Sequence, residues 1–338
     1  MKSALTLLLL APCLWPADTA GAGKEAAAAV ALARDGKYEL ALSHYKAAIA
    51  LDPHLPGIHL NLGLAYFKLD KFADAAPEFE QAVKEDPSSF QAVVLLGMSD
   101  YACRKFDAAA VQLGRAVKQQ PDNIELRFRL AQSYLWSGQY QAAIDEFRLL
   151  LAKNPESGPV HMLLGEVLDA ANQQADATRE FEAAVKASPN EPEVHFGLGY
   201  MYWKQKRYDE AAREFQAEIE KQPRHPQALS YLGDSEMHAE HNAEAEKHLG
   251  QALEMDSGIR LAHLDLGILL KDPDAAAKHL REAIRMDPTK PDAHYRLGRL
   301  LLSLHRADEA QAEFDKVKQL AQQQEAEPLI KVSPRPTP

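Results

Sequence analysis

Apolar residues along this chain recur at the spacing of amphipathic helices. One example is the run of Leu60, Leu62, Leu64, Tyr66 and Phe67, which a turn-like segment at 69–72 follows. No stretch of the sequence shows the alternating, β-branched pattern of a strand. The pattern therefore predicts an all-α fold of short helices joined by turns.

The helical pattern repeats with a period of 34 residues, which is typical of stacked supersecondary units. A proline marks the period, at Pro53, Pro87, Pro121, Pro155, Pro189 and Pro223, with Ser257 and Pro288 at the last two positions. A small residue follows each marker, at Gly63, Gly97, Ala131, Gly165, Gly199, Gly233, Gly267 and Gly298. Further on comes an alanine and, four residues after it, a large apolar residue: Phe79, Leu113, Phe147, Phe181, Phe215, Leu249, Leu280 and Phe314.

Helix packing explains these positions. Small residues let two helices approach closely, and the large residue one turn after the alanine fills the space beyond. Proline lacks an N–H and clashes with a preceding turn, so it ends one helix or opens the next. Each period is therefore predicted to be a helix–turn–helix unit that buries its apolar face against its neighbours.

Two runs make a family resemblance specific. The run from His59 to Tyr66, with Ala75, Phe79 and Pro87, resembles the tetratricopeptide repeat signature, and the run 195–202 fits equally well. The resemblance implies a right-handed superhelical solenoid of about nine helix–turn–helix repeats, spanning 23–324. We place the repeats near 22–55, 56–89, 90–123, 124–157, 158–191, 192–225, 226–259, 260–290 and 291–324. The eighth copy is three residues shorter, so we expect a local break around 271–275.

The two ends of the chain differ in composition from the repeats. Lys2, the apolar stretch 4–10 and the small residues at 20–22 predict a signal peptide at 1–22, and so an exported, periplasmic protein of a bacterium. The apolar stretch is too short to span a bilayer, so no membrane insertion is expected after cleavage. Lipidation at Cys13 is disfavoured, because Pro12 departs from the lipobox pattern. The proline-rich segment 325–338 is predicted to be a disordered tail.

Charge and cysteine content exclude several classes of function. The formal net charge of −11 disfavours binding to nucleic acid or to anionic lipid, which needs clustered lysine and arginine. One cysteine remains after removal of the signal, so no internal disulfide is possible.

Candidate chemistry is sparse. No catalytic, nucleotide-binding or zinc motif occurs, so we predict no enzyme activity, no cofactor and no metal site. Five histidines occupy the same place in their repeats, and we interpret them as planar rings that fill a packing slot: His59, His161, His195, His263 and His294. The cluster of His238, Glu240, His241 and Glu244 is interpreted as solvated turn residues.

The remaining functional surface is the concave face that the resemblance implies, lined by the first helix of each repeat. The candidate partner-binding residues on it are Phe67, Tyr101, Phe128, Trp136, Phe196, Tyr200, Trp203, Tyr231 and Tyr295. We expect about half of them to be buried between repeats. Aromatic residues with a polar rim suit protein and peptide anchoring.

The predicted function is therefore a non-enzymatic scaffold that binds an unidentified protein or peptide. Two alternatives remain open. One is a structural assembly factor that acts through the convex face or the ends. The other is an enzyme with an unrecognised site, which requires convergent titratable groups in a pocket.

Overall fold

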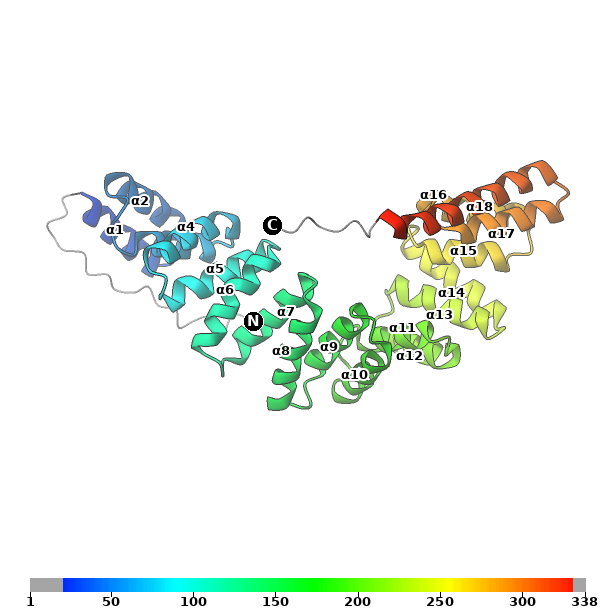
Figure 1. Cartoon of the computed structure of the whole chain (residues 1–338), viewed down its shortest axis with the longest axis horizontal. Helices are drawn as coiled ribbons and strands as arrows, with labels where there is room; N and C mark the ends of the chain where they lie inside the picture. Colours follow the sequence, from blue (N-terminus) through cyan, green and yellow to red (C-terminus); the bar gives the residue numbers. More distant parts are fainter. Residues whose placement is uncertain (1–20, 331–338) are drawn as a thin grey trace. The chain divides into compact units, whose positions relative to one another are not determined.

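The computed structural model describes residues 21–330, and every regular element in that range is an α-helix (Figure 1). Residues 1–20, which hold Cys13 and nearly all of the predicted signal peptide, lie outside the described residues, as do 331–338. The helices are α1 (Ala22–Arg34), α2 (Tyr38–Leu51), α3 (Ile58–Lys68), α4 (Phe72–Glu85), α5 (Phe90–Ala102), α6 (Phe106–Gln119), α7 (Ile124–Trp136), α8 (Tyr140–Lys153), α9 (Gly158–Ala170), α10 (Gln174–Ala187), α11 (Val194–Lys204), α12 (Tyr208–Lys221), α13 (Pro226–His238), α14 (Asn242–Met255), α15 (Arg260–Leu269), α16 (Pro273–Met286), α17 (Pro291–Ser303) and α18 (Ala307–Ile330). These eighteen helices confirm the predicted all-α fold of nine helix–turn–helix repeats.

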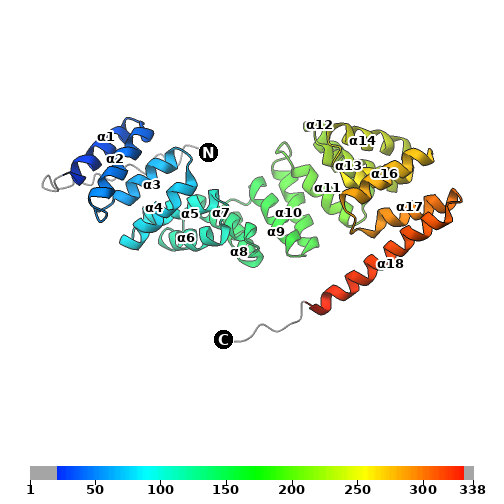
Figure 2. The same cartoon turned by 90° about the horizontal axis from the view of Figure 1, so that it is seen from above.

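The chain divides into two compact units. Unit 1 comprises residues 1–155 and 167–173, and unit 2 comprises 156–166 and 174–338, so the division passes through α9. Within each unit consecutive helices pack side by side, as Figure 2 shows for α3 to α6. No described helix is long and apolar enough to cross a membrane.

The two helices of a repeat meet where the sequence predicts, at the small residue of the first helix. A Cβ built on Gly63 lies 2.7 Å from the ring of Phe79, and one built on Gly199 lies 2.9 Å from the ring of Phe215. Both phenylalanines are fully buried. Glycine is required at these points because the ring occupies the space that a side chain needs.

A left-handed residue closes the turn between the two helices in eight of the nine repeats. These residues are Gly36, Asp70, Arg104, Gly138, Asn172, Lys206, Glu240 and His305. The first helix ends in a Schellman motif at each of them; after α3, for example, the N–H of Lys71 donates to the carbonyl of Tyr66 at 3.0 Å.

The eighth repeat departs from this turn, as its shortened sequence predicts. Helix α15 has ten residues and is followed by Leu270 in an extended conformation. The side chain of Asp272 then caps α16 by accepting from the N–H of Asp274 at 3.1 Å, and Pro273 is the first helical residue. The deletion thus replaces a left-handed turn with an extended link.

The last helix is longer than the repeat pattern requires. Helix α18 continues to Ile330, beyond the end of the repeats that the sequence placed at 324, so the first residues assigned to a disordered tail are helical. Alanine, glutamine and glutamate dominate 321–327, and these residues have high helix propensity.

Candidate partner-binding site

Four of the nine predicted partner-binding residues lie in unit 1 and a fifth lies in α17 of unit 2, and each of the five packs against local neighbours. Phe67 contacts the ring of Phe72 at 5.1 Å between centroids, and Tyr101 contacts Phe106 at 5.6 Å. Trp136 lies 6.5 Å from the Phe106 ring and is 51% exposed. The remaining two behave similarly: Phe128 packs 6.3 Å from Phe147, and Tyr295 of unit 2 packs 6.1 Å from Phe314 while staying 44% exposed.

The other four residues come together in unit 2. Phe196, Tyr200 and Trp203 of α11 and Tyr231 of α13 form what we call the aromatic cluster. Tyr200 stacks on Trp203 at 5.8 Å between centroids, and Tyr231 meets the Trp203 ring edge-on at 5.0 Å. The buried ring of Phe215 lies under the cluster, stacked on Tyr231 at 5.6 Å. The sequence therefore identified the members of the cluster but not that they touch.

The burial of these aromatic residues differs from the expectation that about half are buried. None of the nine is fully buried; Trp136 and Tyr295 are exposed, and the other seven are partly buried. The reason is that Leu, Ala and the second-helix phenylalanines already fill the core, which leaves the first-helix rings at its edge. Each ring thus has an apolar body in contact with protein and a part that faces solvent.

The edge of the aromatic cluster is polar. The indole N–H of Trp203 donates to the carboxyl of Asp234, and the ammonium of Lys204 lies 5.5 Å from the centre of the Tyr200 ring. Burial raises the pKa of Tyr231 to about 12, and the nearby Tyr200 and Asp234 act in the same direction. Aromatic rings with a polar edge are the arrangement that anchors peptide side chains at protein interfaces.

Two buried carboxyl groups meet beside the cluster. Asp234 of α13 and Asp265 of α15 are 4% and 2% exposed, and they hydrogen-bond to each other. Burial raises the pKa of both groups, and the charge of Asp234 raises that of Asp265 further. Two carboxyl groups in contact do not ionise independently, so the ionisation of one raises the pKa of the other. The sequence analysis did not select Asp265.

A second polar network caps the start of α11. The carboxylate of Glu218, which is fully buried, accepts from the backbone N–H groups of Glu193 at 3.1 Å and of Phe196 at 3.2 Å. His225 accepts from the N–H of Ala228 through Nδ1 and approaches the Glu193 carboxylate through Nε2 at 3.1 Å.

This network also contains a geometric candidate for a metal site. Glu193, Glu218 and His225 place one ligand atom each within 4.8 Å of one another. Both oxygens of Glu218 and both ring nitrogens of His225 already make hydrogen bonds that hold helix ends. The donor set is therefore accounted for by capping.

The five histidines fill the predicted packing slot, and they also make a contact that the sequence analysis missed. Nδ1 lies 2.6–2.7 Å from a glutamate of the second helix, nineteen residues later, in the pairs His59–Glu78, His161–Glu180, His195–Glu214 and His294–Glu313. In the shortened repeat His263 meets His279 at 2.9 Å instead. The same slot holds Arg127–Glu146 and Glu25–His44. A polar bond thus joins the two helices in most repeats.

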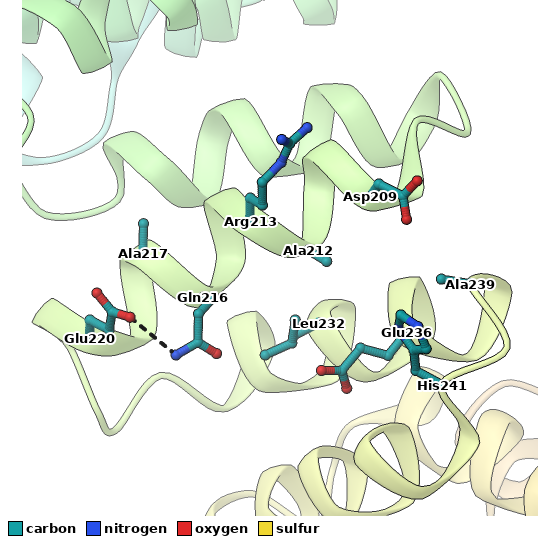
Figure 3. A pocket seen from close by; sticks show the side chains of 10 residues that line it. All are labelled: Asp209, Ala212, Arg213, Gln216, Ala217, Glu220, Leu232, Glu236, Ala239 and His241. Carbon is teal, nitrogen blue, oxygen red and sulfur yellow. Dashed lines mark hydrogen bonds between the residues drawn. The ribbon is translucent and has the colours of Figure 1, made fainter.

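Two hollows lie away from the aromatic cluster. The one in unit 2, of about 430 Å³, is lined by Asp209, Arg213 and Gln216 of α12 and by Leu232 and Glu236 of α13, among others (Figure 3). The Glu236 carboxylate is bound to His248 at 2.8 Å. The one in unit 1, of about 500 Å³, is lined by residues of 54–60 and 82–89. Neither of these two hollows is lined by Asp234 or Asp265.

Comparison with known proteins identifies the repeat. Family models described as TPR repeat or tetratricopeptide repeat match residues 31–70, 56–89, 101–167, 162–228, 203–258 and 267–329. No curated protein matches the chain.

Solved structures show the same architecture. A tetratricopeptide repeat protein from Parabacteroides merdae is 17% identical, with a TM-score of 0.54 over 72% of this chain and 97% of that one. The Cut9–Hcn1 hetero-tetramer of the APC/C contains a chain that is 15% identical, with a TM-score of 0.54 over 81% of this chain and 54% of that one. At these identities the similarity concerns the fold alone.

Proposed function

Because the chain belongs to the tetratricopeptide repeat family, we propose that it is a non-enzymatic scaffold that binds another protein or a peptide through the aromatic cluster of unit 2. The observation that carries this proposal is the cluster itself. Phe196, Tyr200, Trp203 and Tyr231 are partly exposed, in mutual contact, and supported from below by the buried ring of Phe215. A partner's apolar side chain gains contact area there without the cost of ordering loose rings, because the rings already hold one another.

The energetics favour Trp203 as the central anchor. Its ring contacts Tyr200 and Tyr231, and its N–H is already satisfied by Asp234, so binding an apolar group leaves no polar atom unpaired. Truncation of such an anchor typically costs about 2 kcal/mol or more in binding. The net charge of −11 adds a long-range attraction for basic partners, which raises the association rate.

We place this function in a bacterial cell envelope. The support is the sequence of residues 1–22, with Lys2, an apolar stretch and small residues before Gly23. Cell fractionation followed by N-terminal sequencing of the mature protein tests the location. A full-length protein that starts at Met1 and stays in the cytoplasm would overturn it.

The Trp203→Ala variant tests the binding face. Partners are first identified by crosslinking in the envelope fraction and mass spectrometry, and their capture is then compared between wild type and variant. We expect capture to weaken about tenfold or more, in line with the loss of one anchor. Met255→Ala is the matched control, because Met255 is an exposed apolar residue of the same unit on a second helix.

Circular dichroism of both variants shows whether the helices are intact. Equal capture by wild type and a well-folded Trp203→Ala protein would move the binding site away from the aromatic cluster. A scaffold that acts through the opposite face or the ends of the repeats would then be the better account.

A further inference from the structure

Arg129 of α7 is a cation that its neighbours hold in a fixed position. Its guanidinium carbon lies 5.4 Å from the centre of the Tyr101 ring, and Nη1 donates to Oε1 of Gln132 at 3.1 Å. The hydroxyl of Tyr101 donates to the same Oε1 at 3.3 Å, so the tyrosine and the glutamine hold each other as well as the arginine. All three residues lie in unit 1.

This guanidinium has no anionic partner. No carboxylate among the described side chains pairs with Arg129, whereas Arg127 on the same helix is bonded to Glu146. The Nε atom of Arg129 is buried without a hydrogen-bond partner, and the side chain as a whole is partly buried. Removing a charge from water without a counter-ion is costly, and the contact with the Tyr101 ring offsets only part of that cost. Unit 1 therefore keeps a cation that no described carboxylate neutralises.

An aromatic surface continues from this arginine toward solvent. Tyr101 meets the ring of Phe106 edge-on at 5.6 Å between centroids, and Phe106 lies 6.5 Å from the exposed ring of Trp136. We call Tyr101, Phe106 and Trp136 the ring row. It has a partly buried cation at one end and an exposed tryptophan at the other. Arginine and tryptophan are enriched among the residues that anchor partners at protein interfaces.

The charges around the ring row favour a segment with a single carboxylate. Arg104 and Lys105 are exposed in the turn directly before Phe106, and the carboxylate of Asp107, just after it, accepts from Gln139. The net charge of −11 repels an acidic run at long range, but salt screens that repulsion beyond about 8 Å. A carboxylate in contact with the guanidinium lies within that distance.

We propose that Arg129 binds the side-chain carboxylate of an aspartate or glutamate of a partner, while an apolar side chain of the same segment packs on Trp136. The inference goes beyond the proposed function, which concerns unit 2. Nη2 of Arg129 has no hydrogen-bond partner and, unlike Nε, is not buried, so a carboxylate can reach it. The bond is charge-assisted, and it gives the guanidinium the counter-ion that unit 1 lacks.

Three dipeptides test the proposal without knowledge of the partner. Acetyl-Phe-Glu-amide carries a side-chain carboxylate, acetyl-Phe-Gln-amide is its neutral counterpart, and acetyl-Phe-Gln with a free C-terminus carries a terminal carboxylate alone. In the Trp15→Phe, Trp203→Phe background Trp136 is the sole tryptophan, so its fluorescence reports binding in unit 1. We expect a saturable change with the glutamate probe, at an affinity about tenfold higher than that of the neutral probe. Equal affinities of these two probes, or tighter binding of the probe with the free terminus, would overturn the proposal.

Substitution of the arginine supplies a second measurement. Arg129→Met removes the charge and keeps an unbranched side chain, so we expect it to weaken binding of the glutamate probe about tenfold and to leave the neutral probe unaffected. Arg148→Met, which removes an exposed arginine of α8 in the same unit, is the matched control and should not change either affinity. Equal weakening of both probes by Arg129→Met would show that the arginine only supports the ring row, and would contradict the proposal.

A variant of Gln132 tests the site in the opposite direction. The side chain of Gln132 already accepts from Nη1 of Arg129, so a glutamate at this position supplies a carboxylate from within the chain. We expect Gln132→Glu to remove the preference for the glutamate probe while the urea midpoint stays at or above that of the background protein. A folded Gln132→Glu protein that keeps the full preference would refute the assignment of the carboxylate to Arg129.

The two binding surfaces can fail independently. The probes report on Trp136, whereas capture by the Trp203→Ala variant reports on the aromatic cluster of unit 2. If the probes show no preference for glutamate and Trp203→Ala loses capture, only the present inference fails. If the probes show the preference and Trp203→Ala retains capture, the proposed function fails and the inference for unit 1 stands.

Discussion

Replacing Gly199 with alanine places a methyl group against the ring of Phe215, which is packed too tightly to move away. The added Cβ lies 2.9 Å from two ring carbons of Phe215, well inside van der Waals contact. Phe215 is fully buried, and its other neighbours are the rings of Phe196 at 5.7 Å and Tyr231 at 5.6 Å. The strain must therefore be shared by the helix pair rather than relieved by one side chain.

The magnitude follows from two opposing effects. Overpacking of a well-packed core costs about 1–3 kcal/mol, and glycine to alanine in a helix interior gains about 1 kcal/mol. Gly250 isolates the second effect, because it lies inside α14 and a Cβ there meets nothing within 4 Å. We expect Gly250→Ala to stabilise by about 1 kcal/mol and Gly199→Ala to destabilise by up to about 2 kcal/mol.

Urea unfolding followed by far-ultraviolet circular dichroism measures both variants against wild type. The decisive quantity is the difference in the free energy of unfolding between the two variants. Both variants gain the same helix propensity, so this difference reports the contact with Phe215 alone. Equal stabilisation by both substitutions would show that Gly199 does not lie at the contact between α11 and α12. Since the two units of the chain can unfold separately, the comparison uses the transition that Gly250→Ala shifts, which belongs to the same unit.

Two further predictions concern buried carboxyl groups of unit 2. Burial raises the pKa of Asp265 above its unfolded value, so its contribution to stability is present below the unfolded-state pKa and is lost as the pH rises through the folded-state pKa. Urea midpoints between about pH 5 and about pH 8 should therefore fall more with rising pH in wild type than in Asp265→Asn, and parallel pH profiles would contradict this. Glu218→Ala leaves two backbone N–H groups at the start of α11 without their acceptor, which should cost about 2 kcal/mol or more and speed hydrogen exchange of those amides. A variant as stable as wild type would show that water replaces the carboxylate.

The sequence predicted the features of this fold that depend on spacing within one repeat. Gly63 and Phe79, or Gly199 and Phe215, are separated by sixteen residues, and that interval alone brings them together across a turn of constant length. The break in the eighth repeat was predictable for the same reason, because a connection that is three residues shorter has no room for the left-handed turn.

Polar contacts were predicted less well, although a signal for some of them is present. A glutamate follows four of the five slot histidines by nineteen residues, as His59 and Glu78 illustrate. This regularity becomes visible only when second-helix positions are compared across repeats as carefully as first-helix positions are. An interpretation based on ring size alone explains the histidine and overlooks its partner.

Contacts between successive repeats were the least predictable. Trp203 reaches Asp234 and Asp234 reaches Asp265, each across thirty-one residues, and Tyr101 reaches Gln132 across the same interval. That interval depends on the offset between neighbouring first helices, which the amino-acid pattern does not specify. The burial of Asp265 is equally hidden, because aspartate at such a position ordinarily faces water.

Several of the left-handed turns are occupied by residues that make the chain less stable than glycine at the same positions would. Six of the eight are occupied by residues other than glycine, and Arg104, Lys206 and Glu240 are types that tolerate this conformation poorly, at a cost of about 1 kcal/mol each. Gly36 and Gly138 show that glycine is compatible with the same turn. Single substitutions to glycine at these turns would therefore raise stability without changing a residue of the aromatic cluster. A lineage that acquires them first could accept destabilising changes in Tyr200 or Trp203, and so acquire a new partner, without losing the fold.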